Sequence, residues 1–155
     1  MRRKIDDNCI LPLQIARSSY PGSSCMSPIV RHFFLCEDYQ INPQPPHRLT
    51  IEGVIHAIKS LESTPFPLIH QGFCVYLMLT SCRGSAVGKL TIEEADTGEL
   101  ILDGTPHHLH LPNDPIEVIG IPFRIRNLRF PNAGLYWVQF WYNSEMLSQQ
   151  SLILR

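Results

Sequence analysis

One run of aromatic and β-branched residues limits the fold of this chain more than any other feature. Residues 131–142 open with a Pro-Asn-Ala-Gly turn and continue as a strand suited to the centre of an antiparallel sheet. Side chains alternate across a strand, so one face carries Tyr136, Val138, Phe140 and Tyr142. The other face carries Leu135, Trp137, Gln139 and Trp141. Both faces are rich in large side chains, so the pattern predicts a strand covered on two sides.

Short segments of period two recur along the rest of the chain. The further strands expected are 29–36, 73–80, 87–94, 100–102, 117–126 and 147–154. Pro122 places the 117–126 strand at a sheet edge, since proline cannot donate to a strand ladder. Seven or eight short strands without a crossover helix predict an all-β fold, a single immunoglobulin-like antiparallel β-sandwich.

Residues 48–61 fit two periods. A helical stripe is formed by Ile51, Val54, Ile55, Ile58 and Leu61, and Thr50 is a suitable N-cap. Alternation of apolar residues and the early Gly53 favour a strand with a glycine bulge instead. We predict the strand and keep the helix as the alternative.

Residues 1–27 show no period and end in a loop-like Ser, Pro and Gly stretch. We expect a loosely docked or disordered N-terminal extension before a β-sandwich domain at 28–155, with Met26 a candidate true start. The basic first residues are followed at once by Asp6 and Asp7, unlike a signal peptide. No apolar run approaches the ~20 residues of a membrane span. The sequence therefore predicts a cytoplasmic protein with no membrane partner.

Composition narrows the partner classes further. The formal net charge is −1 and only three lysines occur in 155 residues, so nothing favours nucleic acid, which needs clustered cations. Five cysteines are widely spaced without a Cys-x-x-Cys pair, which predicts reduced thiols, the three central ones buried or half-buried. No phosphate-binding loop, nucleophile elbow or zinc-protease motif is present, so no cofactor and no catalytic residue are predicted.

Several landmarks resemble a family of uncharacterised bacterial β-sandwich proteins, a domain of unknown function. They lie at 34–38, 49–54, 66–67, 128–131 and 134–136, and the resemblance spans about residues 28–155. It supports the strand prediction for 48–58 and implies no known activity. Gly134 and Tyr136 also resemble the tyrosine corner of immunoglobulin-like sandwiches, which predicts a structural role for the Tyr136 hydroxyl. The cysteine expected two residues later is Val138, so no antibody-type disulfide follows.

Three polar clusters are candidates for chemistry. In a strand, His108 and His110 of the His107–His110 cluster would share a face and could share a metal ion, as in a cupin-like enzyme or sensor. A polar surface loop is the plainer interpretation. Glu93, Glu94, Asp96 and Glu99 are expected at a solvated hairpin tip. Arg124, Arg126 and Arg129 are expected on an exposed strand face.

The outer faces of the two richest strands give the favoured function. If 73–80 and 134–142 share a sheet, an apolar patch forms opposite the core; its partner-binding residues are Tyr76, Met78, Leu135, Trp137, Gln139 and Trp141. The sequence thus favours a non-enzymatic interaction or assembly module that binds a protein partner or itself. The alternatives are the metal-dependent protein and a carbohydrate-binding sandwich with Trp137 and Trp141 as platforms.

Overall fold

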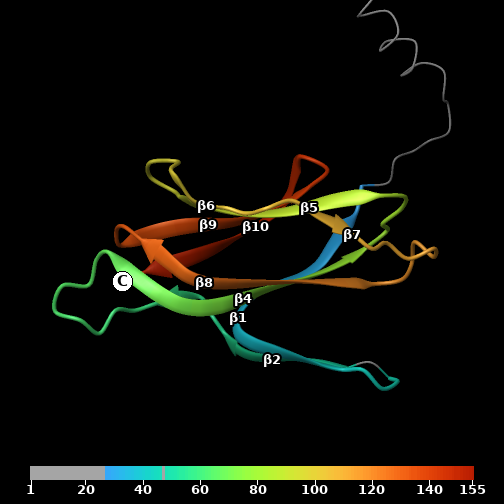
Figure 1. The fold of residues 1–155 in the computed structure, drawn as a ribbon, viewed down its shortest axis with the longest axis horizontal. Coiled ribbons are helices and arrows are strands. Elements are labelled where there is room, and N and C mark those ends of the chain that lie inside the picture. The colour runs from blue at the N-terminus through green and yellow to red at the C-terminus, as the bar shows by residue number, and fades with distance from the viewer. Residues whose placement is uncertain (1–26, 47) are drawn as a thin grey trace, which may run out of the picture.

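The computed structural model describes residues 27–46 and 48–155, which form two sheets that face each other (Figure 1). The strands are β1 (Ile29–Asn42), β2 (Arg48–Val54), β3 (Ala57–Ile58), β4 (Leu68–Thr80), β5 (Ala86–Glu94), β6 (Leu100–Asp103), β7 (His107–Leu109), β8 (Ile119–Phe130), β9 (Gly134–Tyr142) and β10 (Glu145–Leu154). Sheet A has the order β2-β1-β4-β8, and sheet B the order β3-β10-β9-β5-β6 with β7 also beside β5.

These residues contain no helix, which confirms the all-β prediction. Ten strands replace the expected seven or eight, in part because β3 and β7 have only two and three residues, too few to show a period. One pair departs from the predicted antiparallel pattern, since β3 runs parallel to β10. Of the predicted N-terminal extension, residues 1–26 lie outside the described part of the chain.

Sheet A is built around β4, which lies between β1 and β8. Phe73, Val75 and Leu77 point into the core from β4, while Cys74 and Tyr76 are buried on its outer side. The central position predicted for 73–80 is therefore confirmed. The edge position of β8, predicted from Pro122, is confirmed as well.

The first strand is longer than the predicted range 29–36 and does not end at the acidic pair Glu37 and Asp38. The strand continues to Asn42, and Asp38 pairs with Glu52 of β2 in the ladder. The Asp38 carboxylate reaches Arg124 on the outer face, with 3.0 Å between Oδ1 and Nη1. A charged side chain is tolerated within a strand where it faces solvent or an ion-pair partner, and Asp38 has both.

The strand predicted over the ambiguous segment is confirmed, because β2 covers residues 48–54. The glycine bulge is wrong: Cys36 pairs with Val54 and Asp38 with Glu52, so the register is unchanged across Gly53. Gly53 is required for another reason. Its φ is +61°, and a Cβ there would lie 2.6 Å from the Glu37 carboxylate.

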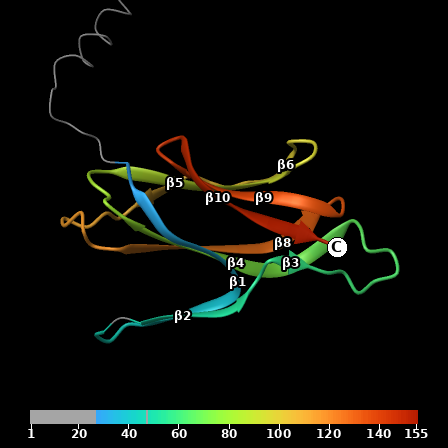
Figure 2. The same ribbon diagram turned by 180° about the vertical axis from the view of Figure 1, so that it is seen from behind.

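In sheet B, β5 and β9 lie side by side, and two hairpins flank them. Asn143 and Ser144 join β9 to β10 with φ values of +49° and +67°, the left-handed pair that a tight two-residue turn requires. Gly98, with φ +70°, shapes the turn from β5 to β6 that the sequence predicted. Seen from behind, β1 and β10 close the side opposite β6 and β8 (Figure 2).

The core fills the space between the sheets. Its largest fully buried side chains include Phe73, Leu77 and Leu79 of sheet A, and Ile92, Tyr136 and Phe140 of sheet B. Each stabilises the fold by about 1.5–3 kcal/mol relative to an exposed side chain. The inner face of β9, predicted to lie opposite Trp137 and Trp141, is thus confirmed. The Tyr136 hydroxyl donates to the carbonyl oxygen of Asn132 at 2.8 Å, which confirms its structural role at the entrance of β9.

Candidate functional site on the outer face of sheet B

The outer face of sheet B carries a cross-strand set of polar and aromatic side chains. Lys89 and Thr91 of β5 stand opposite Trp141 and Gln139 of β9 in the antiparallel register. Directly opposite residues on one face have Cβ atoms roughly 5 Å apart, which is within reach of side-chain contact. The pairing of β5 with β9 therefore brings them together, although about 50 positions separate the two strands in the chain.

A continuous line of hydrogen bonds crosses this face. The Trp141 indole Nε1 donates to Thr91 Oγ1 at 2.8 Å, and Thr91 Oγ1 donates to Gln139 Oε1 at 3.1 Å. Gln139 Nε2 donates in turn to Glu93 Oε1 at 3.0 Å. Gln139 is only 7% exposed, so these bonds satisfy a polar side chain that packs under its neighbours. The network fixes the side chains in single orientations.

The Trp141 indole extends from β9 towards β5, because its N–H reaches Thr91 rather than solvent. The side chain is half-buried, with its polar edge already occupied. What remains for a ligand is the apolar part of the ring. A rigid, half-exposed tryptophan of this kind is typical of recognition sites.

A groove of about 460 Å³ runs over Trp141, Thr91 and Gln139. Its walls include Gly98 and Leu100 beside the β5–β6 turn and Ser144 in the β9–β10 turn. Both turns rise from the sheet on the side away from sheet A (Figure 1). Lys89 and Asp103 form an ion pair in the groove, with side chains 32% and 60% exposed, so charge lies within reach of a bound molecule.

The predicted apolar patch is divided between two sheets, which corrects the sequence analysis. β4 belongs to sheet A and β9 to sheet B, so Tyr76 and Met78 lie on the opposite side of the molecule from Trp137 and Trp141. The chain itself covers Tyr76, whose ring centroid is 5.1 Å from that of Tyr39. Of the six predicted residues, Gln139 and Trp141 line the groove, and Trp137 does not.

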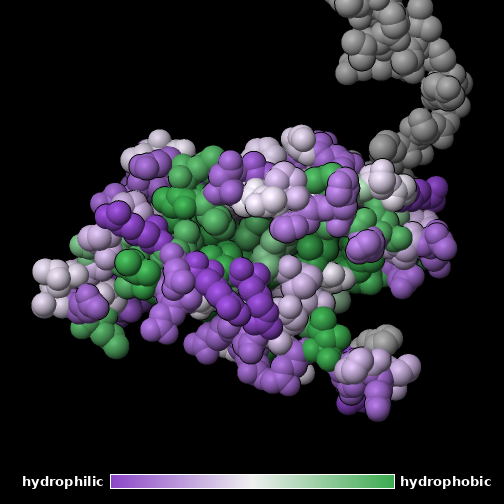
Figure 3. Space-filling view, viewed as in Figure 1, coloured by the Kyte–Doolittle hydropathy of each residue, from purple (hydrophilic) through white to green (hydrophobic). Residues whose placement is uncertain are grey.

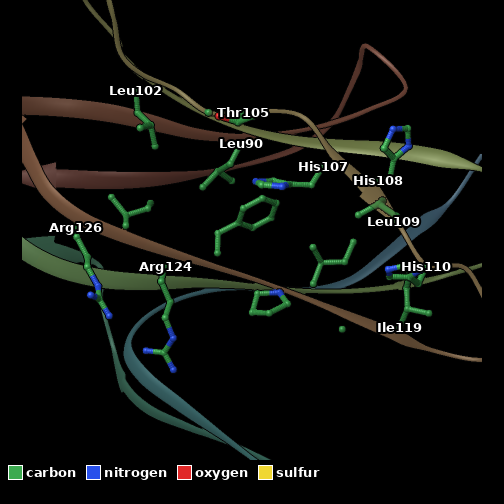
Figure 4. A pocket seen from close by; sticks show the side chains of 16 residues that line it. Leu90, Leu102, Thr105, His107, His108, Leu109, His110, Ile119, Arg124 and Arg126 are labelled. Carbon is green, nitrogen blue, oxygen red and sulfur yellow. The ribbon is translucent and has the colours of Figure 1, made fainter.

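The side chains of His107, His108 and His110 do not converge on one point (Figure 4). His108 and His110 point in different directions from β7 and its end, and His107 points into a cleft between the sheets, 6.5 Å from Phe123 (ring centroids; Figure 4). Among residues 27–46 and 48–155, no group of three or more His, Cys, Asp or Glu side chains is placed to hold a metal ion. The shared face predicted for His108 and His110 is wrong because β7 ends at Leu109.

The cysteines within the described residues are Cys36, Cys74 and Cys82, all free and buried, as predicted. Cys9 and Cys25 lie outside that part of the chain. Burial, together with the neighbouring Cys74 and Asp38, raises the pKa of the Cys36 thiol to about 11. A thiol with such a pKa stays protonated at neutral pH, so Cys36 is a poor nucleophile.

One of the four acidic residues predicted at the solvated hairpin tip is buried instead. Glu94 is 5% exposed rather than solvated at a tip. Its carboxylate accepts hydrogen bonds from Thr97 Oγ1 at 2.8 Å and from Asn132 Nδ2 at 3.2 Å. The bond from Thr97 could be predicted from the sequence, because Thr97 lies three residues after Glu94. The bond from Asn132 could not, because Asn132 lies in a turn 38 positions away.

The exposed position predicted for the three arginines of β8 is confirmed. Arg124 forms an ion pair with Asp38, and all three arginines are exposed on β8. The Arg124 guanidinium also lies 4.7 Å from the Tyr39 ring centroid, a cation–π contact.

No helix of the described residues has the length and hydropathy to cross a membrane.

Two open sheets packed face to face, one of them with a grooved outer surface, define the class: an all-β protein of two-sheet architecture. Within that class, the chain belongs to the family of unknown function DUF6941, whose family model matches residues 31–155. This confirms the resemblance found in the sequence. No curated protein matches the chain.

Several solved structures have a low similarity to this chain. The β-D-glucoside glucohydrolase of Trichoderma reesei is 12% identical with a TM-score of 0.46, over 83% of this chain and 19% of that one. The alkylpurine DNA glycosylase AlkC of Pseudomonas fluorescens, bound to DNA with an abasic site analogue, is 14% identical with a TM-score of 0.46, over 83% and 30%. The β-glucosidase of Listeria innocua in complex with glucose is 9% identical with a TM-score of 0.45, over 79% and 16%. This chain thus spans less than a third of each, and these distant likenesses support no function.

Proposed function

We propose that this protein is a non-enzymatic binding module of immunoglobulin-like architecture, and that it binds a protein partner in the groove over Trp141. The immunoglobulin-like assignment is supported by the Tyr136–Asn132 hydrogen bond at the start of β9, which resembles a tyrosine corner. The binding site is supported by one observation above all: the Trp141 N–H is bonded to Thr91, so a preorganised aromatic side chain lies in the groove.

The surroundings of Trp141 have the anatomy of a protein interface. Binding energy in such interfaces is concentrated on a few aromatic or arginine anchors, with polar groups around them. Here Thr91 and Gln139 are already hydrogen-bonded to each other. A partner that covers them therefore leaves neither side chain without a hydrogen bond. Rotamers fixed before binding also lower the entropy lost on association.

The shape of the groove favours a different protein over a second copy of this chain. The β5–β6 and β9–β10 turns project beyond the face that they enclose (Figure 1). Two copies meeting through this face would touch turn against turn and leave the groove empty. A convex segment of a partner fits between the turns.

A carbohydrate ligand is the second candidate. A single flat ring beside the side chains of Thr91, Gln139 and Glu93 would suit the apolar face and hydroxyl groups of a sugar. The two-tryptophan platform expected from the sequence is not favoured, because Trp137 lies outside the groove.

The two tryptophans of β9 provide a matched experiment. Trp141→Ala removes the anchor, whereas Trp137→Ala removes the same side chain from the same face of the same strand but outside the groove. Full-length protein and both variants are used in quantitative pull-downs and on a glycan array, after thermal unfolding has shown that each is folded. We expect a partner captured by wild-type protein and by Trp137→Ala, and lost by Trp141→Ala.

Two outcomes decide against this proposal. Capture that is equal for wild-type and Trp141→Ala protein would remove the groove from consideration. Binding to glycans with the same dependence on Trp141, and no protein partner, would favour the carbohydrate candidate.

A further inference from the structure

The free edge of β8 offers hydrogen-bonding groups that the fold leaves unused. β8 pairs with β4 on one side and is the last strand of sheet A. In an antiparallel ladder only alternate residues bond to a given neighbour, so half of the N–H and C=O groups of an edge strand point away from its sheet. No group within residues 27–46 and 48–155 bonds to the backbone of β8 from that side.

A cleft of about 630 Å³, lined by apolar side chains and by His107, His108 and His110, opens beside this edge, between the two sheets. Ile121, Phe123 and Ile125 of β8 line one side, and Leu90, Leu102 and Leu109 of sheet B line the other. In Figure 3 apolar surface extends between the level of sheet B and that of β8, with strongly hydrophilic side chains below it. The cleft is therefore open at the surface, although Leu90, Ile121 and Ile125, which line it, are themselves buried.

The other face of β8 is cationic. Arg124 and Arg126 point away from the cleft (Figure 4). Arg124 is paired with Asp38, but Arg126 and Arg129 have no carboxylate partner among the described residues. One strand thus presents an apolar side, a cationic side and an open backbone edge.

We propose that β8 accepts an extended segment of a partner protein as an additional strand of sheet A, and that this segment alternates apolar and acidic side chains. Addition of a strand would pair the free backbone groups of β8. Alternate side chains of the added strand would enter the cleft, and the others would lie beside Arg126 and Arg129 at cross-strand distance. This site is separate from the Trp141 groove and does not depend on the function proposed for it.

Charge distinguishes this occupant from a second copy of the chain. Two β8 strands paired antiparallel about their arginines would bring like charges together, which is unfavourable. Proline and charged residues also protect edge strands against unwanted pairing. Protection alone does not account for an open apolar cleft behind the strand, whereas a docking strand needs one.

Synthetic peptides of roughly nine residues, a common strand length, test the proposal on the full-length protein. The acidic probe alternates valine or isoleucine with glutamate, and its charge control has lysine in place of each glutamate. Two further peptides keep the acidic sequence but carry N-methyl groups on alternate amide nitrogens, in opposite phases, so that each lacks the ladder donors of one edge. Affinity is measured by fluorescence anisotropy, and the binding site is mapped by amide shifts in ¹⁵N-labelled protein.

The protein variants reverse charge at an exposed pair. We expect the double change Arg126→Glu, Arg129→Glu to weaken the acidic peptide roughly tenfold and to strengthen the lysine peptide. Arg48→Glu on β2, at the opposite edge of sheet A, is the matched control and should change neither affinity by more than about twofold. Both N-methylated peptides made with opposite phases are compared, and the one that blocks pairing should not bind.

Four outcomes would overturn the proposal: equal binding of acidic and lysine peptides, equal binding of both N-methylated forms, amide shifts confined to residues away from β8, or no binding of the acidic peptide at any soluble concentration. Light scattering adds a further decisive result. A dimer that the acidic peptide dissociates would show that a second copy occupies the edge.

Discussion

The Glu94 carboxylate accepts a hydrogen bond from the Asn132 side-chain amide at 3.2 Å, although 38 positions separate the two residues. Glu94 ends β5, and Asn132 lies in the turn between β8 and β9. The same carboxylate receives the Thr97 hydroxyl at 2.8 Å. One buried side chain therefore fixes two turns at the same end of the molecule, and because β8 belongs to sheet A, it helps to set how the sheets meet there.

Removal of this carboxylate is expected to destabilise the protein. Glu94→Ala leaves the Asn132 amide and the Thr97 hydroxyl without their acceptor, which costs about 1–3 kcal/mol in the free energy of unfolding. Glu94→Gln keeps an oxygen acceptor in nearly the same shape and should lose less. Urea denaturation followed by circular dichroism measures both variants. Equal stability of Glu94→Ala and wild-type protein would contradict this role.

Tyr136→Phe tests the corner at the start of β9. The change keeps the ring, which packs edge-on against Phe130 with centroids 5.2 Å apart, but removes the hydroxyl bonded to the Asn132 backbone. We expect a loss of about 1–2 kcal/mol, since the Asn132 carbonyl loses its buried donor. Tyr39→Phe, on the outer face of sheet A, is the control and should stay within about 0.5 kcal/mol of wild type in chemical denaturation.

Gly120 and Tyr76 form a steric pair that a double-mutant cycle can resolve. A Cβ at Gly120 would lie 2.0 Å from the Tyr76 hydroxyl oxygen, and the Tyr76 side chain is held by Tyr39. Gly120→Ala should therefore destabilise the protein by about 1–3 kcal/mol. Tyr76→Phe removes the nearest atom, so the double variant should recover part of that loss. Strict additivity of the two changes would show that they do not touch.

Stability should fall in the alkaline range because of Cys36. Its pKa is about 11 in the folded protein, against an ordinary value of 9.0, chiefly because of burial. The unfolded chain therefore releases this proton first, so the free energy of unfolding decreases as pH rises from 9 towards 11 and is unaffected by Cys36 below that window.

Chemical denaturation at a series of pH values measures this slope. Cys36→Ala should give a shallower decrease, with a residual slope from Cys74 and Cys82, whose pKa values burial also raises. An unchanged slope in the variant would assign the effect to other groups.

Much of the fold could be predicted from patterns of a few consecutive residues. Alternation in β9 predicts that Tyr136 faces the core and that Trp137 faces outward, and Pro122 predicts the edge position of β8. These inferences succeed because the side-chain period and the missing proline donor are properties of a few consecutive residues. The corner formed by Tyr136 was also predicted from local residues. So was the strand β2, in which Ile51 and its neighbours pair with β1 and do not form the alternative helix.

What the sequence by itself determined was the longer strands, the inner face of β9 and the family. Only the tertiary structure decided that β4 and β9 lie in different sheets, which separates Tyr76 from Trp141, and that two turns enclose a groove around Trp141. It also decided that Asn132 donates a hydrogen bond to the buried Glu94 carboxylate and that β8 borders an open cleft. The physical reason is that strand pairing joins residues far apart in the chain, and period two records which way a side chain points but not which strand lies beside it.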